Sequence, residues 1–230
     1  MSNARPIGGG CDPGAQGGTK VARRNEHHTS AASKRAILEA VLERALEAGY
    51  EGTTMADVAR ASKLPIGSVY WHFQNKEQLF VELLDYCFDV WQQTHSTITD
   101  VRGFLRRTIG SSAAASATSA DPAAAFWSIG LVFAFERRLT DNLARQRYLG
   151  IREEMFQFVV TRLQGAFPEA PEEVAAELAR DLATLGRALT DGFRAAAAAG
   201  DEVDLARYAD LAADALESLV SARLKEYSNA

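Results

Sequence analysis

One short stretch of the sequence, TTMADVARASKLPIGSVYWHF at 53–73, contains several side chains suited to binding another molecule. Their chemistry indicates binding and not catalysis. Near its end two small residues are followed by two large aromatic rings and an imidazole, and a lysine comes shortly after. Small residues let another molecule approach the backbone closely, whereas hydroxyl, imidazole and ammonium groups hydrogen-bond to phosphate oxygens and to base edges. The residues concerned are Gly67, Ser68, Tyr70, Trp71, His72 and Lys76.

We expect two short helices, separated by a tight turn, to position these residues. Thr54 is a suitable N-cap, and Asp57 follows it three residues later as a short version of a capping box. The first short helix should end at Lys63. Pro65 suits the first turn of the second helix, because a proline there gives up no needed N–H, and this helix should run to about Phe73.

Two short helices joined in this way have the form of a helix-turn-helix, whose second helix enters the major groove of DNA. Val69 and Phe73 should point inward and hold the two helices together. Residues at the exposed front of the second helix are then expected to meet base edges: Ile66, Gly67, Ser68 and Trp71. Side chains around it are expected to bind phosphates and set the register: Thr54, Tyr70, His72 and Lys76.

The segment from Ile37 to about Phe80, ILEAVLERALEAGYEGTTMADVARASKLPIGSVYWHFQNKEQLF, resembles the DNA-binding domain of TetR-type transcriptional regulators. The resemblance rests on features at that family's spacing: a first helix that ends in GY, the capping threonine, the GSVYWHF core and the KEQL that follows. Three positions depart from the family's pattern. Lys63 replaces a turn glycine, Pro65 a capping Ser or Thr, and Ala56 a polar residue.

This resemblance implies a homodimeric repressor of operator DNA, with a small DNA-binding domain on a larger helical domain that dimerises and holds a small-molecule effector. Effector binding would move the fourth helix and spread the two recognition helices. Because half-sites lie ~10 bp apart or a multiple of that distance, such a movement would lower the affinity for DNA. An effector can act in this way only through different affinities for the two states.

The remaining sequence predicts an all-α protein in three parts. Residues 1–30 are rich in Gly and polar residues, and we expect a flexible arm there, with the first helix opening near Ser33. Residues 31–77 should form the three-helix DNA-binding domain, and 78–230 a larger helical effector-binding and dimerisation domain. In this last part apolar residues recur every three or four positions, and no alternating strand pattern is found.

Charge is distributed unevenly along the chain. Residues 20–80 contain nine Lys or Arg and seven Asp or Glu, a net charge of +2, whereas 81–230 contain 15 and 22, a net charge of −7. This asymmetry favours phosphate contact by the first part only. A basic cluster in the expected arm either reaches a DNA groove or belongs to a solvated tail: Lys20, Arg23 and Arg24.

Composition favours a cytoplasmic protein. With 47% apolar and 24% charged residues the chain is typical of a soluble globular protein, and no apolar run reaches the length of a membrane span. The two cysteines, Cys11 and Cys87, are not expected to form a disulfide, and no secretory signal begins the sequence. We therefore expect no membrane association.

Aromatic and sulfur-containing side chains of the larger domain predict a cavity for an apolar or aromatic effector. The alternative is that they fill an ordinary core, and both interpretations remain open. The candidate ligand-binding residues are Phe104, Phe126, Trp127, Tyr148, Met155 and Phe158. The last two helices, rich in Ala and Leu, are expected to pair with those of a second copy in a four-helix bundle.

No pattern of a known catalytic site is found. The sequence has no nucleophile elbow, no HExxH zinc motif and no glycine-rich phosphate loop, so we expect no catalysis, no cofactor and no metal site. Two other classes of function remain possible. One is an architectural DNA-binding protein without an effector, and the other is a helical carrier of a small ligand.

Overall fold

The computed structural model describes residues 18–114, 121–139 and 141–228, and the all-α prediction is confirmed. Those residues form nine α-helices and one short 3-10 helix, and they contain no strand. Among the described helices, none is both long and apolar enough to cross a membrane. The helices are α1 (Gly18–Gly52), α2 (Met55–Ser62), α3 (Ile66–His72), α4 (Lys76–His95), α5 (Val101–Ala114), α6 (Pro122–Phe135), η1 (Arg137–Leu139), α7 (Leu143–Gln164), α8 (Glu172–Ala198) and α9 (Leu205–Ser228).

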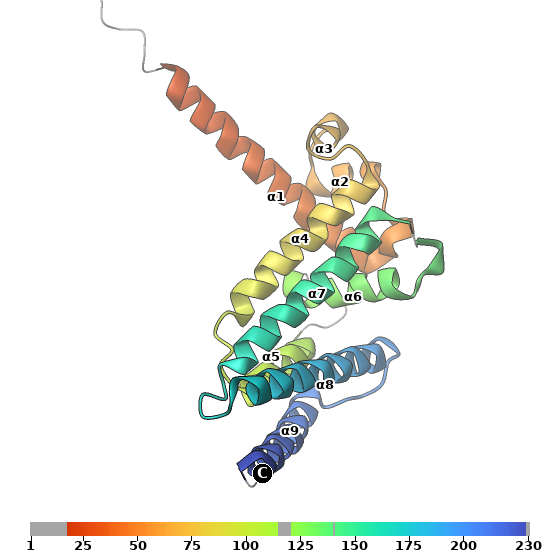
Figure 1. Ribbon diagram of the computed structural model, residues 1–230. Helices are drawn as coiled ribbons and strands as arrows, with labels where there is room; N and C mark the ends of the chain where they lie inside the picture. Colours follow the sequence, from red (N-terminus) through yellow and green to blue (C-terminus); the bar gives the residue numbers. More distant parts are fainter. Residues whose placement is uncertain (1–17, 115–120, 140, 229–230) are drawn as a thin grey trace, which may run out of the picture.

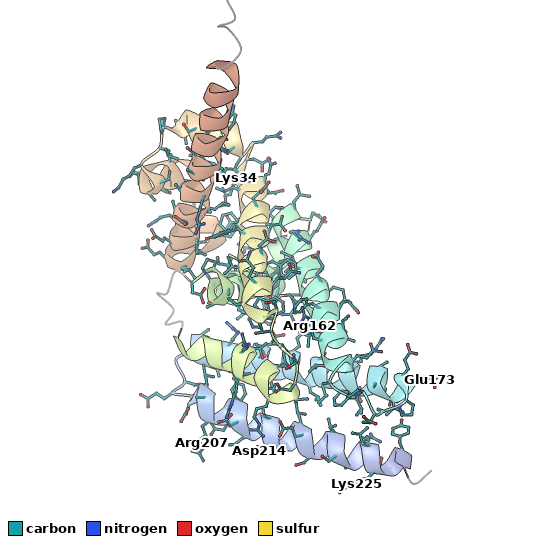
Figure 2. All side chains as sticks on the ribbon, turned by 90° about the vertical axis from the view of Figure 1, so that its left-hand side faces the viewer. Lys34, Arg162, Glu173, Arg207, Asp214 and Lys225 are labelled. Atoms are coloured by element: carbon teal, nitrogen blue, oxygen red, sulfur yellow. The ribbon has the colours of Figure 1, made fainter. Side chains whose placement is uncertain are left out.

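The short helices α2 and α3 lie at one end of the molecule, and α5, α8 and α9 lie at the other (Figure 1). Helices α4 and α7 run side by side between the two ends, and α6 packs against α1, α4 and α7. At the far end α5 packs on α9 and on α8, and all three cross beneath α4 and α7, as the side view in Figure 2 shows. The helix-turn-helix therefore stands at the end of a long helical body.

Helix α1 begins earlier than the sequence pattern predicted. We expected its start near Ser33, but it begins at Gly18, so residues 18–30 of the expected arm are helical and 1–17 lie outside the described residues. No Gly or Pro occurs between Gly18 and Gly49, whereas the apolar periodicity starts only at Ile37, which explains the difference. Gly49 breaks the helix as expected, at φ 68° and ψ −173°, a conformation that favours glycine.

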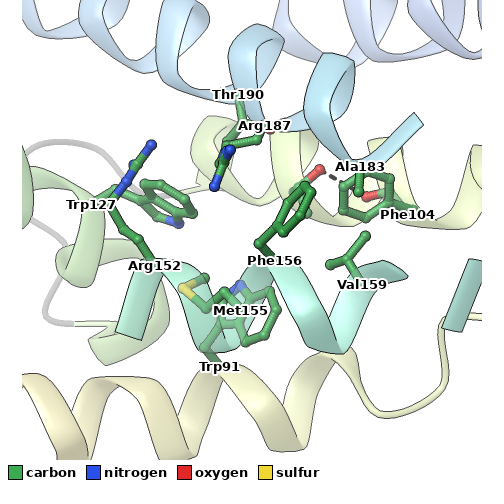
Figure 3. Close-up of a pocket in the computed structure, with 11 residues that line it drawn as sticks. Trp91, Phe104, Trp127, Arg152, Met155, Phe156, Val159, Ala183, Arg187 and Thr190 are labelled. Carbon is green, nitrogen blue, oxygen red and sulfur yellow. Dashed lines mark hydrogen bonds between the residues drawn. The ribbon is translucent and has the colours of Figure 1, made fainter. Parts of the chain in front are cut away.

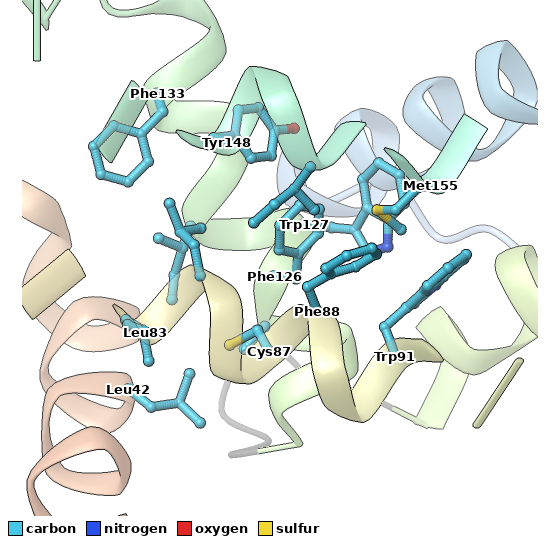
Figure 4. Close-up of a cluster of buried hydrophobic side chains, with 14 of the residues drawn as sticks. Leu42, Leu83, Cys87, Phe88, Trp91, Phe126, Trp127, Phe133, Tyr148 and Met155 are labelled. Carbon is cyan, nitrogen blue, oxygen red and sulfur yellow. The ribbon is translucent and has the colours of Figure 1, made fainter. Parts of the chain in front are cut away.

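A continuous core connects the two ends of the molecule. Figure 4 shows side chains of α1 meeting those of the first half of α4, while the second half of α4 meets α6 and α7. Core burial keeps the Cys87 thiol away from water and raises its pKa to about 12, so the thiol is unreactive at neutral pH. The buried residues labelled in this view include Leu42, Leu83, Cys87, Phe88, Trp91, Phe126, Trp127 and Phe133.

Tyr50 joins the N-terminal helices to the rest of the protein. Its ring packs edge-on against Phe80 of α4 and Phe133 of α6, with ring centroids 4.7 and 5.2 Å apart. Its hydroxyl accepts a hydrogen bond of 2.8 Å from Nδ2 of Asn142, which also lies 3.2 Å from Oε1 of Glu77. The Asn142 Oδ1 atom accepts backbone N–H groups in the first turn of α7, so one amide caps a helix and links two domains.

Helices α6 and α7 are in very close contact where Gly130 faces Tyr148. The Tyr148 side chain is fully buried, and a Cβ atom at position 130 would overlap its ring. Burial also raises the pKa of the Tyr148 hydroxyl. The absence of a side chain at Gly130 therefore sets how closely these two helices pack.

We predict that Gly130→Ala lowers the free energy of unfolding by about 1–3 kcal/mol, because the added methyl group has no room against Tyr148. Gly150→Ala is the matched control on α7, where the nearest atom to a new Cβ is Arg147 Nη1 at 3.6 Å. This control should be neutral or stabilising by about 0.5–1 kcal/mol. Urea unfolding of both variants measures the difference, and equal midpoints would contradict the close-packing argument.

Candidate nucleic-acid interface and effector cavity

Helix α2 is capped as the sequence predicted. Thr54 Oγ1 accepts the backbone N–H of Asp57 at 3.1 Å and donates to Oδ2 of Asp57 at 2.6 Å. The hydrogen bond from Thr54 keeps the pKa of the Asp57 carboxyl below its usual range. Lys63 ends the helix in the left-handed region, at φ 58° and ψ 27°, which is where a glycine is favoured. A tight turn to α3 follows.

Helix α3 is held by two inward side chains and presents large rings outward. Val69 and Phe73 are completely buried, as expected. Tyr70 and Trp71 are 53% and 73% exposed, and Ile66, one turn before Tyr70, is 44% exposed. Ile66 and Tyr70 lie one turn apart on α3, and Trp71 follows Tyr70 directly, so the three give this helix an exposed apolar surface, which we call the ridge of α3. Exposed apolar surfaces of this kind mark interaction sites.

The small residues of α3 leave this ridge accessible. Gly67 is exposed, and no other atom lies within 4 Å of where its Cβ would be. Ser68 is half-buried beside it. His72 is also half-buried, with its ring centroid 4.6 Å from that of Trp71, and burial lowers its pKa, so the imidazole is neutral at pH 7. A neutral ring still hydrogen-bonds to a phosphate.

Two of the predicted phosphate contacts are already engaged within the protein. The Thr54 hydroxyl is used in the cap of α2. The Lys76 ammonium donates to the backbone oxygen of Glu51 at 3.3 Å and lies 4.2 Å from the centre of the Tyr50 ring. Lys76 therefore points toward the end of α1, and it would have to leave these contacts to reach DNA.

One further candidate for phosphate binding was not predicted from the sequence. Lys63 is exposed in the turn that joins α2 to α3, directly before the ridge of α3. We had interpreted this residue only as a helix end. The sequence already shows its positive charge and its place in the turn. Together they make Lys63 a candidate to bind a phosphate group beside α3.

A small cavity lies in the larger domain, among α4, α5, α6, α7 and α8 (Figure 3). Its volume is about 30 Å³ for the centres of water-sized molecules, and about 380 Å³ with its open mouth included. In this form it holds little more than water, so a larger ligand requires side chains to move. Its lining residues are Trp91, Phe104, Thr108, Trp127, Arg152, Met155, Phe156, Val159, Ala183, Arg187 and Thr190.

The structure separates the candidate ligand-binding residues into two groups. Phe104, Trp127 and Met155 line the cavity. Phe126 and Tyr148 are fully buried and pack against each other outside it, with ring centroids 5.2 Å apart. Phe158 does not line the cavity either. It packs edge-on against Trp91, with ring centroids 5.6 Å apart. All six remain predictions as ligand contacts.

Helix α8 supplies lining residues that the sequence argument missed. Ala183, Arg187 and Thr190 are spaced by four and three residues, so they share one face of the helix. We had interpreted α8 as a dimerisation helix, and this polar and small face does not stand out among its many alanines. Trp91 of α4 was also missed, because it continues an apolar stripe that the core alone explains.

Polar groups beside the cavity are arranged in pairs and stacks. Arg152 donates two hydrogen bonds to Asp191, of 3.1 and 2.6 Å, and the bond to Asp191 raises the pKa of the guanidinium. His95 stacks on Trp91 at 4.3 Å, and burial lowers its pKa to about 4, so it is neutral. In the part of the chain that the structure describes, no three metal-binding side chains come together.

Residues 37–83 match the sequence model of the family described as "Bacterial regulatory proteins, tetR family". A similar curated protein is the "Probable acrEF/envCD operon repressor" of Escherichia coli strain K12, which is 35% identical over 51 residues. That match covers 22% of this chain and only 23% of the repressor. The sequence similarity is therefore confined to the helix-turn-helix region.

Solved structures resemble a larger part of the chain. NalD of Pseudomonas aeruginosa, a repressor of the MexAB-OprM multidrug efflux pump, has a TM-score of 0.56 at 20% identity, over 82% of this chain and 96% of NalD. FadR of Bacillus subtilis, solved with stearoyl-CoA, has a TM-score of 0.54 at 15% identity, over 79% and 96%. At such identities the likeness shows the fold alone. Residues 37–83 therefore carry the region that the tetR family model describes, and the larger part of the chain shares the fold of these two solved proteins.

Proposed function

We propose that the protein is a ligand-responsive transcriptional regulator, a repressor that leaves operator DNA when a small apolar or aromatic effector binds the larger domain. The observation that carries this proposal is the exposed ridge of Ile66, Tyr70 and Trp71 on a helix that Val69 and Phe73 hold in place. A short helix presented in this way fits the major groove. The curated relative is named an operon repressor, which agrees with this role.

Dimerisation is the second part of the proposal. Two recognition helices must be held one helical turn of DNA apart, and a two-fold pair of subunits does this. Helices α8 and α9 are suited to the contact because they expose several large apolar side chains far from the helix-turn-helix. These are Leu185, Tyr208, Leu211, Leu219 and Tyr227.

Communication between the cavity and DNA is the third part. Trp127 of α6 and Arg152 of α7 line the cavity. Near the end of α6 Phe133 contacts Tyr50, and so does Asn142, the N-cap of α7. An effector that displaces α6 or α7 would therefore act on the attachment of the DNA-binding domain. The likeness to FadR, solved with stearoyl-CoA, supports a ligand in this fold.

Purified protein should bind DNA from the region flanking its own gene with sequence selectivity, measured by fluorescence anisotropy in excess competitor DNA. We predict that Trp71→Ala weakens this binding by about 1–3 kcal/mol, because the exposed indole meets the groove. Phe135→Ala is the matched control, since Phe135 is 78% exposed on α6. Equal affinities for both variants would contradict the role of α3.

The salt dependence of binding tests whether the turn meets phosphate. A plot of log K against log salt concentration has a negative slope. We predict that Lys63→Gln makes this slope less negative by about 0.9, the value for one lost phosphate contact. Lys225→Gln, which changes another exposed cation near the end of α9, should leave the slope unchanged. If the Lys63 variant keeps the parent slope, Lys63 does not bind phosphate.

The same assays distinguish the two other classes of function. An architectural protein would bind DNA but would not respond to any small molecule. A ligand carrier would bind DNA weakly, and Trp71→Ala would then change little. The regulator proposal requires both selective DNA binding and its release by a ligand.

A further inference from the structure

The cavity is bordered by more positive charge than negative charge. Its eleven lining residues include two arginines, Arg152 and Arg187, and no carboxylate. Asp191 accepts two hydrogen bonds from Arg152 and neutralises its charge. The lining is otherwise apolar apart from two threonines, so the remaining charge faces an environment of low polarity.

Arg187 has an aromatic ring as its partner. Its guanidinium lies 4.5 Å from the centre of the Phe156 ring. Within the described residues, no carboxylate forms an ion pair with it. Both side chains are half-buried, and Figure 3 shows them next to each other, Arg187 from α8 and Phe156 from α7. A cation–π contact at a partly exposed site is weak, so an anion would be a stronger partner for the guanidinium.

Arg194 lies two turns further along α8 and is a buried cation that contacts two residues of the cavity lining, Trp127 and Thr108. It is 9% exposed, lies 5.0 Å from the Trp127 ring, and donates to the backbone oxygen of Thr108 at 3.2 Å. Its Nε atom is buried without a hydrogen-bond partner in the described part of the chain. Burial lowers its pKa to about 10, so it stays charged at pH 7. Asp191 acts on it electrostatically but forms no ion pair.

We propose that the effector of this cavity is a compact aromatic anion, whose carboxylate or phosphate group binds Arg187 while its ring lies among Trp91, Trp127 and Phe156. This inference rests on the proposed function, since it names the chemical class of the effector. The anion takes the guanidinium of Arg187 away from Phe156. Because the cavity as it stands holds little more than water, both side chains must move for the ring to enter.

The three arginines contribute in different ways. Arg187 supplies the direct hydrogen bonds, because it lines the cavity and gives up only a ring contact. Arg152 stays paired with Asp191 and makes no direct contact with the head group. Arg194 lies behind Trp127 and Thr108, so it makes no contact but lowers the energy of a negative charge nearby.

Isothermal titration calorimetry with the full-length protein tests the inference. The probes are 2-naphthoate and 2-naphthyl phosphate, with 2-naphthalenemethanol as the neutral analogue. We predict that at least one anion binds on the order of tenfold or more tighter than the alcohol, the effect of a charge-assisted hydrogen bond. The tighter anion identifies the head group. Equal affinities for all three, or no binding of any, would overturn the inference.

Two variants locate the site. Arg187→Gln should remove the preference for the anion and leave the affinity for the alcohol unchanged, which also shows that the variant is folded. Arg162→Gln is the matched control, because Arg162 is exposed on α7 and stacks on Phe158 at 5.1 Å but does not line the cavity. It should keep the parent preference. If the Arg187 variant still binds the anion more tightly than the alcohol, the anion does not bind in this cavity.

The same probes separate this inference from the proposed function. If the preferred anion binds through Arg187 but does not release DNA, the anion site stands and the effector-controlled repressor does not. If DNA binding is selective while none of the probes binds, the DNA-binding role stands and the anion site is wrong.

Discussion

The position of the DNA-binding domain depends on the packing around Tyr50. This one side chain touches α4 through Phe80 and α6 through Phe133, and its hydroxyl is held by Asn142 at the start of α7. Close-packed contacts of this kind do not deform continuously but change between discrete arrangements. Under the proposed function, a shift of α6 or α7 reaches α1 and α4 through Tyr50, and α3 moves with them.

Much of the fold could be predicted because its signals are local. The cap at Thr54, the stop at Gly49 and the start of α4 at Lys76 each depend on the chemistry of a few neighbouring residues. Burial of Val69 and Phe73 followed from the helical period alone. The start of α1 could not be placed in this way, since a helix that projects from the body needs no apolar stripe (Figure 1).

The cavity was harder to predict because it depends on how helices cross. Phe126 and Trp127 are neighbours in sequence and both are aromatic, yet only Trp127 lines the cavity. Both are buried, and which of them meets the cavity depends on how α6 packs against other helices, as in the close contact of Gly130 with Tyr148 of α7. The face of α8 that carries Arg187 joins the cavity for the same reason, and periodicity could not distinguish it from a dimer surface.

The tryptophans have a consequence for how this protein can be observed. The chain has three, and each lies at a place where binding is proposed: Trp71 on the exposed side of α3, and Trp91 and Trp127 in the cavity wall. The first is in water and the other two are buried, so their emission differs in wavelength. Intrinsic fluorescence can therefore follow occupation of the groove-facing helix and of the cavity as two separate signals, without any attached label.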